Sequence, residues 1–143
     1  MPAPRTIRAR AEVARADFKL AGRLLDQADN HLKSAAIPGV DREGRFTLLY
    51  DAARKASDAV LRAEGRRITR GAGHHIAYLA EAKRLLGSDH EQLLTRVEAA
   101  RVTRNQAEYQ ARDVTQTELT DLDDAARALV AVARAHVALL ATD

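Results

Sequence analysis

The sequence predicts an all-α fold, an antiparallel up-and-down four-helix bundle with one additional short helix. Apolar residues recur at steps of three and four along most of the chain, whereas no segment shows the alternation typical of a strand. The breaks between the apolar stripes are short, which favours antiparallel neighbours. Hydrophobic residues make up 46% of the chain and aromatics only 3%, so Ala, Leu, Val and Ile must form the core. Such small side chains let helices approach closely.

The first two helices are predicted to form a hairpin. The apolar stripe of the first helix consists of Ala14, Phe18, Ala21, Leu25, Ala28, Leu32 and Ala35. Pro38-Gly39 ends this helix, and Asp41 supplies a start signal for the second. The second stripe consists of Phe46, Leu49, Ala53, Ala56, Val60 and Ala63. Glu64-Gly65 ends the second helix.

The next segment, 66–73, holds two glycines and three arginines, which predicts an exposed, mobile basic loop. A shorter helix follows, and Gly87 closes it as a C-terminal cap. The thin inner face of this helix consists of Ile76, Leu79, Lys83 and Leu86. Ser88-Asp89-His90-Glu91 then matches a capping box, so it is predicted to start the fourth helix.

The fourth helix is predicted to weaken between Tyr109 and Thr115, where Thr115-Gln116-Thr117-Glu118 gives a new start signal. Either threonine could cap the last helix. The buried positions of the fourth helix are expected to be Leu93 or Leu94, Val97, Ala100 and Ala107. Those of the last helix are expected to be Leu119, Leu122, Ala126, Leu129, Ala133, Val137 and Leu140.

Length and composition predict one helical domain over residues 1–143, with 1–10 flexible or forming a helix extension. The chain has no cysteine, which excludes disulfides, thiolate metal sites and a cysteine nucleophile. No stretch is long and apolar enough to span a bilayer. We therefore expect a cytoplasmic protein of bacterial type. The net charge of +3 could attract nucleic acid but does not require it.

The main candidate site lies within nine consecutive positions of the predicted fourth helix. It combines Arg101, Arg104, Asn105, Glu108 and Tyr109 beside an apolar helical pattern. Two arginines three residues apart share one side of a helix, and their guanidinium groups suit phosphate or carboxylate. An RNA backbone is one candidate ligand.

A structural interpretation of the same residues is favoured by spacing alone. Arg104 would then pair with Glu108 one turn later, and Arg101 with Glu98 or Asn105. These pairs would form a polar network on a helix surface or at a subunit contact.

The histidines indicate no metal site. His74 and His75 are adjacent, so on a helix their side chains point about 100° apart and cannot chelate one ion as an i, i+4 pair would. A role in starting the helix fits them better. The other histidines, His31, His90 and His136, have no acidic partner at a recognisable ligand spacing. We therefore expect neither a metal nor a cofactor.

Two segments of the chain resemble the HEPN superfamily (higher eukaryotes and prokaryotes nucleotide-binding), in particular its single-domain bacterial members. Residues 48–65, followed by Gly73-His74-His75, are similar to the second HEPN helix and the short helix after it. The run Arg104-Asn105-Gln106-Ala107-Glu108-Tyr109 is similar to the HEPN signature, an Arg followed by a polar residue and, four to six residues on, a His.

The resemblance implies a homodimer in which the two signature segments face each other across a shared cleft. In active members this cleft cleaves RNA without a metal. The Arg stabilises the charge that develops on the phosphate, and the His transfers a proton. Here Tyr109 stands at the position of the His. A phenol with a pKa of about 10 is a weak base at neutral pH, although it can donate a hydrogen bond.

Three hypotheses follow. In the first, a HEPN homodimer binds RNA or a nucleotide with little or no catalysis. Its catalytic-type residues would be Arg104, Asn105 and Tyr109, and its binding residues Arg101 and Glu108. In the second, the chain is an active toxin-like, metal-independent ribonuclease of a toxin–antitoxin or phage-defence pair, with a nucleotidyltransferase antitoxin as partner. In the third, the polar network only holds a non-catalytic dimer together.

Overall fold

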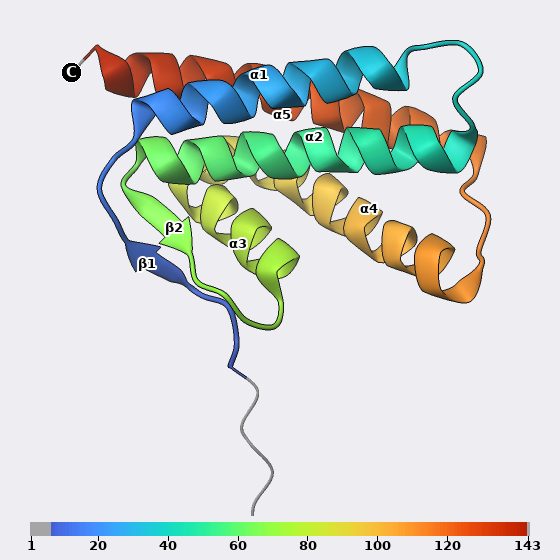
Figure 1. Cartoon of the computed structure of the whole chain (residues 1–143), viewed down its shortest axis with the longest axis horizontal. Coiled ribbons are helices and arrows are strands. Elements are labelled where there is room, and N and C mark those ends of the chain that lie inside the picture. The colour runs from blue at the N-terminus through green and yellow to red at the C-terminus, as the bar shows by residue number, and fades with distance from the viewer. Residues whose placement is uncertain (1–6, 143) are drawn as a thin grey trace, which may run out of the picture.

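The described part of the chain, residues 7–142, folds into five α-helices and one short strand pair in the computed structural model. In chain order the elements are β1 (Ala11–Val13), α1 (Phe18–Ala35), α2 (Arg42–Ala63), β2 (Arg66–Ile68), α3 (His74–Leu86), a 3-10 turn (Ser88–His90), α4 (Glu91–Gln110) and α5 (Gln116–Ala141). Figure 1 shows α1, α2 and α5 side by side, with α3 and α4 inclined beneath them. The predominantly helical prediction is confirmed.

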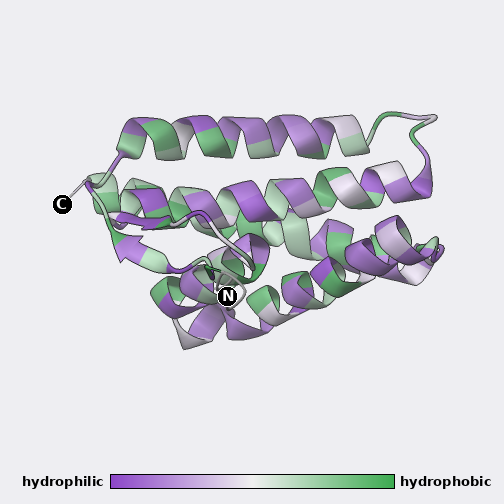
Figure 2. Cartoon of the chain, turned by 60° about the horizontal axis from the view of Figure 1, so that its bottom comes forward, coloured by the Kyte–Doolittle hydropathy of each residue, from purple (hydrophilic) through white to green (hydrophobic). Residues whose placement is uncertain are grey.

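Helix α2 lies at the centre of the fold because it packs against every other helix. Its largest fully buried side chains are Phe46 and Tyr50. Hydrophobic and hydrophilic residues alternate along the helices (Figure 2), as expected when each helix turns one side to the core. None of the described helices is long and apolar enough to cross a membrane.

The predicted apolar stripe of α1 is confirmed except at its first two positions. Ala21, Leu25, Ala28, Leu32 and Ala35 are all buried. Ala14, however, precedes the helix, because the side chain of Asp17 accepts a hydrogen bond from the amide of Leu20 and starts α1 at Phe18. Phe18 itself is 40% exposed.

The predicted start signals of α2 and α5 are confirmed. Asp41 caps α2 by accepting from the amide of Gly44 at 3.0 Å. Thr115 caps α5 in a reciprocal capping box with Glu118. Thr115 Oγ1 accepts from the Glu118 amide at 3.1 Å, and Glu118 Oε1 accepts from the Thr115 amide at 3.0 Å.

The predicted capping box at Ser88 is wrong. Residues Ser88–His90 form a 3-10 turn with no side-chain cap, and α4 begins only at Glu91. The buried positions of α4 are Leu94, Val97, Ala100 and Ala107, which selects Leu94 over Leu93. Residue types alone cannot distinguish a capping box from a tight turn, because both use Ser and Asp.

The prediction that 66–73 is a mobile loop is also wrong. β2 pairs antiparallel with β1, with Ala11 opposite Ile68 and Val13 opposite Arg66. The expected flexible or helical N-terminal segment is extended over residues 7–10, where Arg8 bridges Ala72; residues 1–6 lie outside the described part. The strands are too short for alternation to be recognised in the sequence.

Gly71 lies where the N-terminal segment crosses close to the turn before α3. Its φ is +147°, and a Cβ there would lie 2.5 Å from the carbonyl oxygen of Ile7 and 2.9 Å from the amide of Ala9. Only glycine fits this backbone conformation and this approach without a shift. The N-terminal segment therefore packs tightly beside the start of α3.

Candidate anion-binding site

Two aromatic rings from different helices form the centre of the candidate site. Tyr50 of α2 and His75 at the start of α3 lie with their ring planes 8° apart and their centroids 5.6 Å apart. The Tyr50 hydroxyl is 2.9 Å from Nδ1 of His75. Tyr50 is fully buried, whereas His75 is partly exposed to solvent. One polar edge of the pair is therefore accessible.

His74 fixes the position of the first turn of α3. Its Nε2 lies 2.8 Å from the carbonyl oxygen of Thr69 and 3.1 Å from the amide nitrogen of Gly71. One ring nitrogen can either donate to Thr69 or accept from Gly71, depending on its proton. In both cases the ring ties α3 to the turn before it. The expectation that this His pair helps to start the helix agrees with this geometry for His74.

Arg104 of α4 lies over the buried tyrosine. Its Cζ is 5.5 Å from the centroid of the Tyr50 ring, a cation–π distance. Nη1 of Arg104 is 3.4 Å from Glu108, as the structural interpretation expected. Its Nε is buried and has no hydrogen-bond partner within residues 7–142. The guanidinium therefore retains donor capacity.

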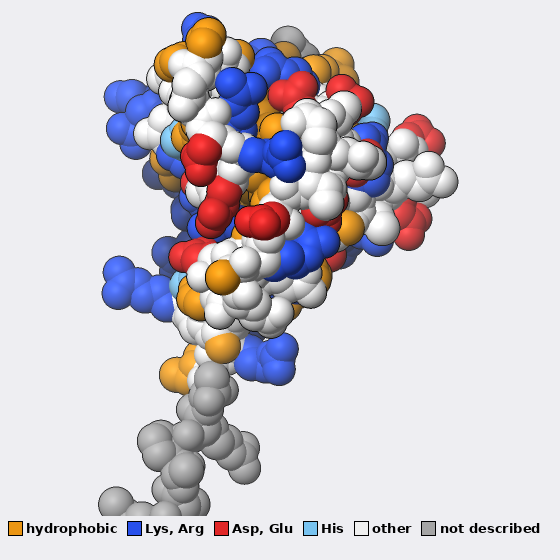
Figure 3. All heavy atoms as spheres, turned by 90° about the vertical axis from the view of Figure 1, so that its right-hand side faces the viewer, with side chains coloured by type: hydrophobic (Ala, Val, Ile, Leu, Met, Phe, Trp, Pro, Cys, Tyr) orange, Lys and Arg blue, Asp and Glu red, His pale blue; other side chains and the backbone are white. Residues whose placement is uncertain are grey.

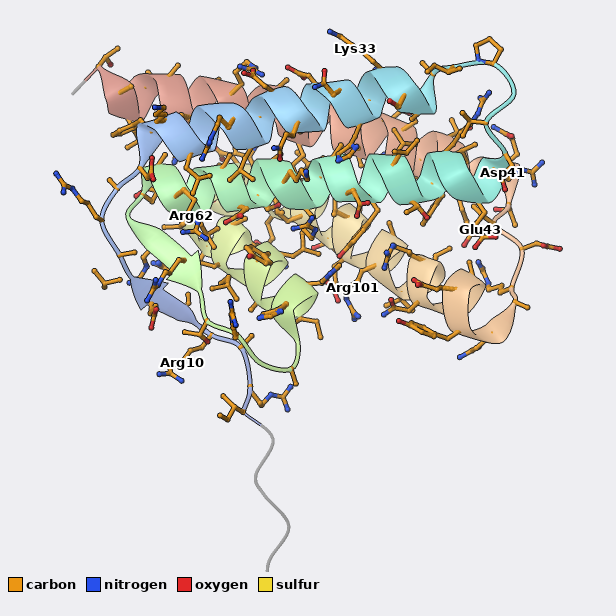
Figure 4. The ribbon with its side chains drawn as sticks, viewed as in Figure 1. Arg10, Lys33, Asp41, Glu43, Arg62 and Arg101 are labelled. Carbon is orange, nitrogen blue, oxygen red and sulfur yellow. The ribbon has the colours of Figure 1, made fainter. Side chains whose placement is uncertain are left out.

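Arg101 lies one turn before Arg104 on the same side of α4. Its Nε is 2.8 Å from Glu98, so the first of the two expected partners is confirmed. Figure 4 shows Arg101 beneath α2, in the region between α3 and α4. Both of the paired carboxylates are partly exposed, Glu98 by 38% and Glu108 by 48%. Ion pairs with exposed carboxylates contribute little energy, so a phosphate could displace them.

Arg54 adds a third guanidinium from α2, one helical turn after Tyr50. It makes no ion pair with any residue of the described part, although its charge acts on both Tyr50 and His75. Tyr50, Arg54, His75, Arg101 and Arg104 will be called the arginine–histidine cluster. Three helices contribute to it.

The cluster combines fixed positive charges with a neutral imidazole. Burial lowers the pKa of His75 from its usual value, and the charges of Arg54, Arg104 and Arg101 lower it further, while Asp51 opposes them. Burial raises the pKa of Tyr50 well above its ordinary range. At neutral pH both rings are therefore uncharged, and the positive charge of the cluster comes from its arginines.

A buried carboxylate lies next to the cluster on α2. Asp58 is only 7% exposed, and its Oδ1 accepts from Nε of Arg62 at 3.3 Å. Burial raises its pKa, although Arg62 and Arg54 oppose this shift. Asp58 in turn helps to raise the pKa of Tyr78 on α3, after burial. The contact between α2 and α3 thus includes polar groups at two places, Tyr50 with His75 and Asp58 near Tyr78.

The remaining residues of the predicted site lie away from the buried rings. Tyr109 is 78% exposed. Together with Asn105 and Arg101 it lines a shallow depression on the outer side of α4, along with Val102, Gln106 and Gln110. The structure thus places Arg104 over Tyr50. Arg101 lies close enough for its charge to act on Tyr50 and His75, and it also lines the depression that contains Asn105 and Tyr109.

Tyr50, Arg54 and His75 are not among the site residues that the sequence predicts. A signal was present in α2, because Tyr50, Arg54 and Asp58 repeat at steps of four and form a polar stripe opposite the apolar one. Such a stripe on a central helix indicates a polar contact. No sequence pattern pairs this stripe with His75, which lies 25 residues beyond Tyr50.

The chemistry of the cluster favours anions over metals. Within residues 7–142 no group of three or more His, Cys, Asp or Glu side chains is arranged to hold a metal ion. Guanidinium groups, in contrast, bind phosphate or carboxylate oxygens through paired N–H donors. Comparison with protein-family models, with curated proteins and with solved structures finds no match for this chain.

Proposed function

We propose that the chain is a HEPN-like homodimer that binds RNA or a nucleotide at the arginine–histidine cluster, with weak or no ribonuclease activity. The observation that carries the proposal is the guanidinium of Arg104, which lies 5.5 Å from the centroid of the Tyr50 ring beside the Tyr50–His75 pair and has a buried Nε without a hydrogen-bond partner in the described part. Phosphate is the common anion of biology that best matches several converging arginines. The partly exposed Asn105 could supply further hydrogen bonds, and the exposed Tyr109 could stack on a base.

The homodimer is supported by apolar side chains on the outer faces of α3 and α4. Ile76 and Val102 are each 44% exposed, and Tyr109 is 78% exposed. Near Ile76, a shallow and mostly apolar groove between the two helices is lined also by Leu79, Ala80 and Leu94. Adjacent exposed apolar groups on a protein surface favour association. We also propose that the four long helices form an up-and-down bundle, to which α3 is the additional short helix.

The binding proposal is tested with the double substitution Arg101→Ala/Arg104→Ala. We expect affinity for a single-stranded RNA oligomer, measured by fluorescence anisotropy, to fall at least about tenfold. A matched control is Arg96→Ala/Arg127→Ala, which removes two other ion-paired arginines on α4 and α5. Affinity that is equally affected in both variants, or unchanged in the first, would count against the cluster.

Active, metal-independent RNA cleavage is the second candidate, and the position of His75 favours it. The histidine missing at position 109 has a potential substitute from α3, beside Arg101 and Arg104. With its proton on Nδ1, His75 donates to the Tyr50 hydroxyl, and its Nε2 is a free base. Nε2 would take the proton of a 2′-hydroxyl as O2′ bonds to phosphorus and the P–O5′ bond breaks. The 5′-oxygen would take a proton from solvent.

Cleavage is measured on an RNA oligomer in the presence of a chelator. We expect His75→Gln to abolish any 2′,3′-cyclic phosphate product while leaving affinity for RNA within about threefold. His31→Gln is the control, because His31 is a partly buried histidine outside the cluster. Wild-type protein that yields no product, or His75→Gln protein with full activity, would eliminate this candidate.

The proposed biological role rests on the HEPN resemblance alone. A toxin–antitoxin or phage-defence role in the bacterial cytoplasm, with a nucleotidyltransferase antitoxin as partner, is part of the proposal on that ground. Growth arrest on expression, relieved by Arg101→Ala/Arg104→Ala, would support a toxin. Normal growth with intact protein would favour the third hypothesis, a non-catalytic interaction module in which the Arg–Glu pairs serve assembly.

A further inference from the structure

The strand pair carries a second concentration of positive charge. Segments 7–15 and 66–73 together contain six arginines and one carboxylate, Glu12. Glu12 pairs with Arg67, and Arg66 pairs with Glu81 of α3. The exposed arginines left without an ion-pair partner in the described part are Arg8, Arg10, Arg15 and Arg70.

Arg8 and Arg10 point outward because the extended segment alternates. Ala9 and Ala11, between and beyond them, pack against the core, so the arginines lie on the opposite face. In such a segment, same-face residues are about 6.6 Å apart. Arg70 lies two residues after the end of β2 and is also exposed. These three side chains, Arg8, Arg10 and Arg70, will be called the ribbon arginines.

The backbone around the ribbon arginines is held by hydrogen bonds. The Ala9 amide donates to the carbonyl of Ala72 at 2.7 Å, and the Ala72 amide donates to that of Ile7 at 2.8 Å. The Arg10 amide donates to Oγ1 of Thr69 at 3.0 Å. A charge set on a fixed backbone loses less conformational entropy on binding than one on a free tail.

Arg70 links the ribbon arginines to the arginine–histidine cluster along the chain. Arg70 is in the turn that His74 closes, and His75 is the next residue of α3. Figure 4 shows Arg10 and Arg101 on the underside of the molecule, whereas Lys33 lies at the top. On the end that carries the α1–α2 and α4–α5 connections, acidic and basic side chains are interspersed (Figure 3), so no comparable patch of one sign forms there.

We propose that the ribbon arginines extend the arginine–histidine cluster, so that the ligand is an RNA strand several nucleotides long rather than a mononucleotide. This inference rests on the proposed binding function. One phosphate lies at the cluster, and the strand continues past the start of α3 onto the ribbon. The contacts there are to the backbone, so they add affinity without base specificity.

The test compares binding of a 12-nucleotide single-stranded RNA and of AMP to three proteins. The wild type is compared with Arg8→Ala/Arg10→Ala/Arg70→Ala and with a control that removes three exposed charges from α1, Lys19→Ala/Arg23→Ala/Lys33→Ala. For the ribbon variant we expect about a tenfold loss of oligomer affinity at low salt. The slope of log affinity against log salt should fall by about two, at roughly 0.7 per lost contact. AMP binding should not change.

The outcomes separate this inference from the proposed function. An unchanged oligomer affinity and salt slope in the ribbon variant would overturn the inference, as would wild-type protein that binds AMP as tightly as the oligomer. In both cases binding at the cluster stands. Loss of binding to anionic phospholipid vesicles, with oligomer binding intact, would assign the ribbon to a membrane surface instead. Wild-type protein that binds neither RNA nor AMP would overturn both proposals.

Discussion

Helix α2 takes part in two interfaces that differ in how many polar groups they contain. With α1 and α5 it forms an apolar interior: all five buried residues of α1 are Ala or Leu, and all eight of α5 are Ala, Leu or Val. With α3 and α4 it forms the arginine–histidine cluster and the buried Asp58. The first interface will be called the alanine layer.

The difference between the two interfaces indicates that one contributes stability and the other holds the candidate site. The alanine layer gains stability from burial of apolar area and from close helix approach. The cluster holds polar groups that desolvation penalises, including a buried Nε of Arg104 without a partner in the described part. A site that costs stability in this way is typical of function, and the alanine layer offsets the cost.

The largest effect is expected in the alanine layer. Leu129 of α5 is completely buried, so Leu129→Ala should lower the free energy of unfolding by about 2–5 kcal/mol. Urea denaturation followed by circular dichroism measures this change. Ile76→Ala on α3 is the matched control, because its side chain is 44% exposed and it should cost clearly less. Similar losses in the two variants would contradict the assignment of stability to burial in the alanine layer.

The α4–α5 connection joins the helix of the cluster to a helix of the alanine layer. A substitution there should give the next largest loss in the free energy of unfolding. Glu118 accepts hydrogen bonds from Arg112, the Thr115 amide and Thr103. The contact with Arg112, followed by those with Thr115, lowers its pKa to about 2. Glu118→Gln should cost about 1–2 kcal/mol at pH 7, since a cap and a charged pair are both weakened.

The pH dependence of this effect has a definite sign. Because the pKa of Glu118 is lower in the folded state than its ordinary 4.5, its stabilisation is complete above pH 4.5 and is lost as the pH falls toward 2. The stability difference between wild type and Glu118→Gln should therefore shrink over that range in urea titrations. A difference that stays constant between pH 7 and pH 3 would contradict the role of the ionised carboxylate.

A smaller effect is expected from His75, in the cluster itself. Its pKa is lowered on folding, so the unfolded chain binds more protons below about pH 6.5. Stability should thus fall as the pH drops below 6.5 and level off below the folded pKa. His75→Gln should flatten this part of the profile. Burial also lowers the pKa of His31, so this residue contributes to the same part of the pH profile. Comparing His75→Gln with the double variant His75→Gln/His31→Gln separates the contributions of the two histidines.

The smallest effect on folding is expected at Tyr109. With 78% of the side chain exposed, Tyr109→Ala should change the free energy of unfolding by no more than about 0.5 kcal/mol. In the proposed dimer the same substitution should weaken self-association, which sedimentation velocity measures over a concentration series. A monomeric wild type would remove the dimer from the proposal, and the cluster would then have to act within one protomer.

The long helices were predictable because the signals for each helix lie within its own segment of the sequence. The stripe of α1 and the cap residues Asp41 and Thr115 follow from local spacing and local hydrogen bonds. The strand pair was not predictable in this way. Each strand has only three residues, and Ala11 pairs with Ile68 far along the chain, so the pairing depends on tertiary structure.

The candidate site was predictable only on α4. The pairs of Arg101 with Glu98 and of Arg104 with Glu108 lie within one helical turn, so spacing was sufficient. The contact of Tyr50 with His75 depends on where α3 crosses α2, which spacing along either helix does not contain. The sequence therefore identified two of the three arginines of the cluster and missed Arg54 and the two rings.

The close approach of the Ile7 carbonyl to Gly71 limits which residues can replace this glycine. A side chain there would have to push the Ile7 carbonyl aside, and this would separate the N-terminal segment from the first turn of α3. In a library randomised at position 71 and sorted for folded variants that bind RNA, glycine should dominate. In a library randomised at Arg70 and sorted for folding alone, many residues should be tolerated. A substitution at Gly71 could thus displace the start of α3 without removing any guanidinium group.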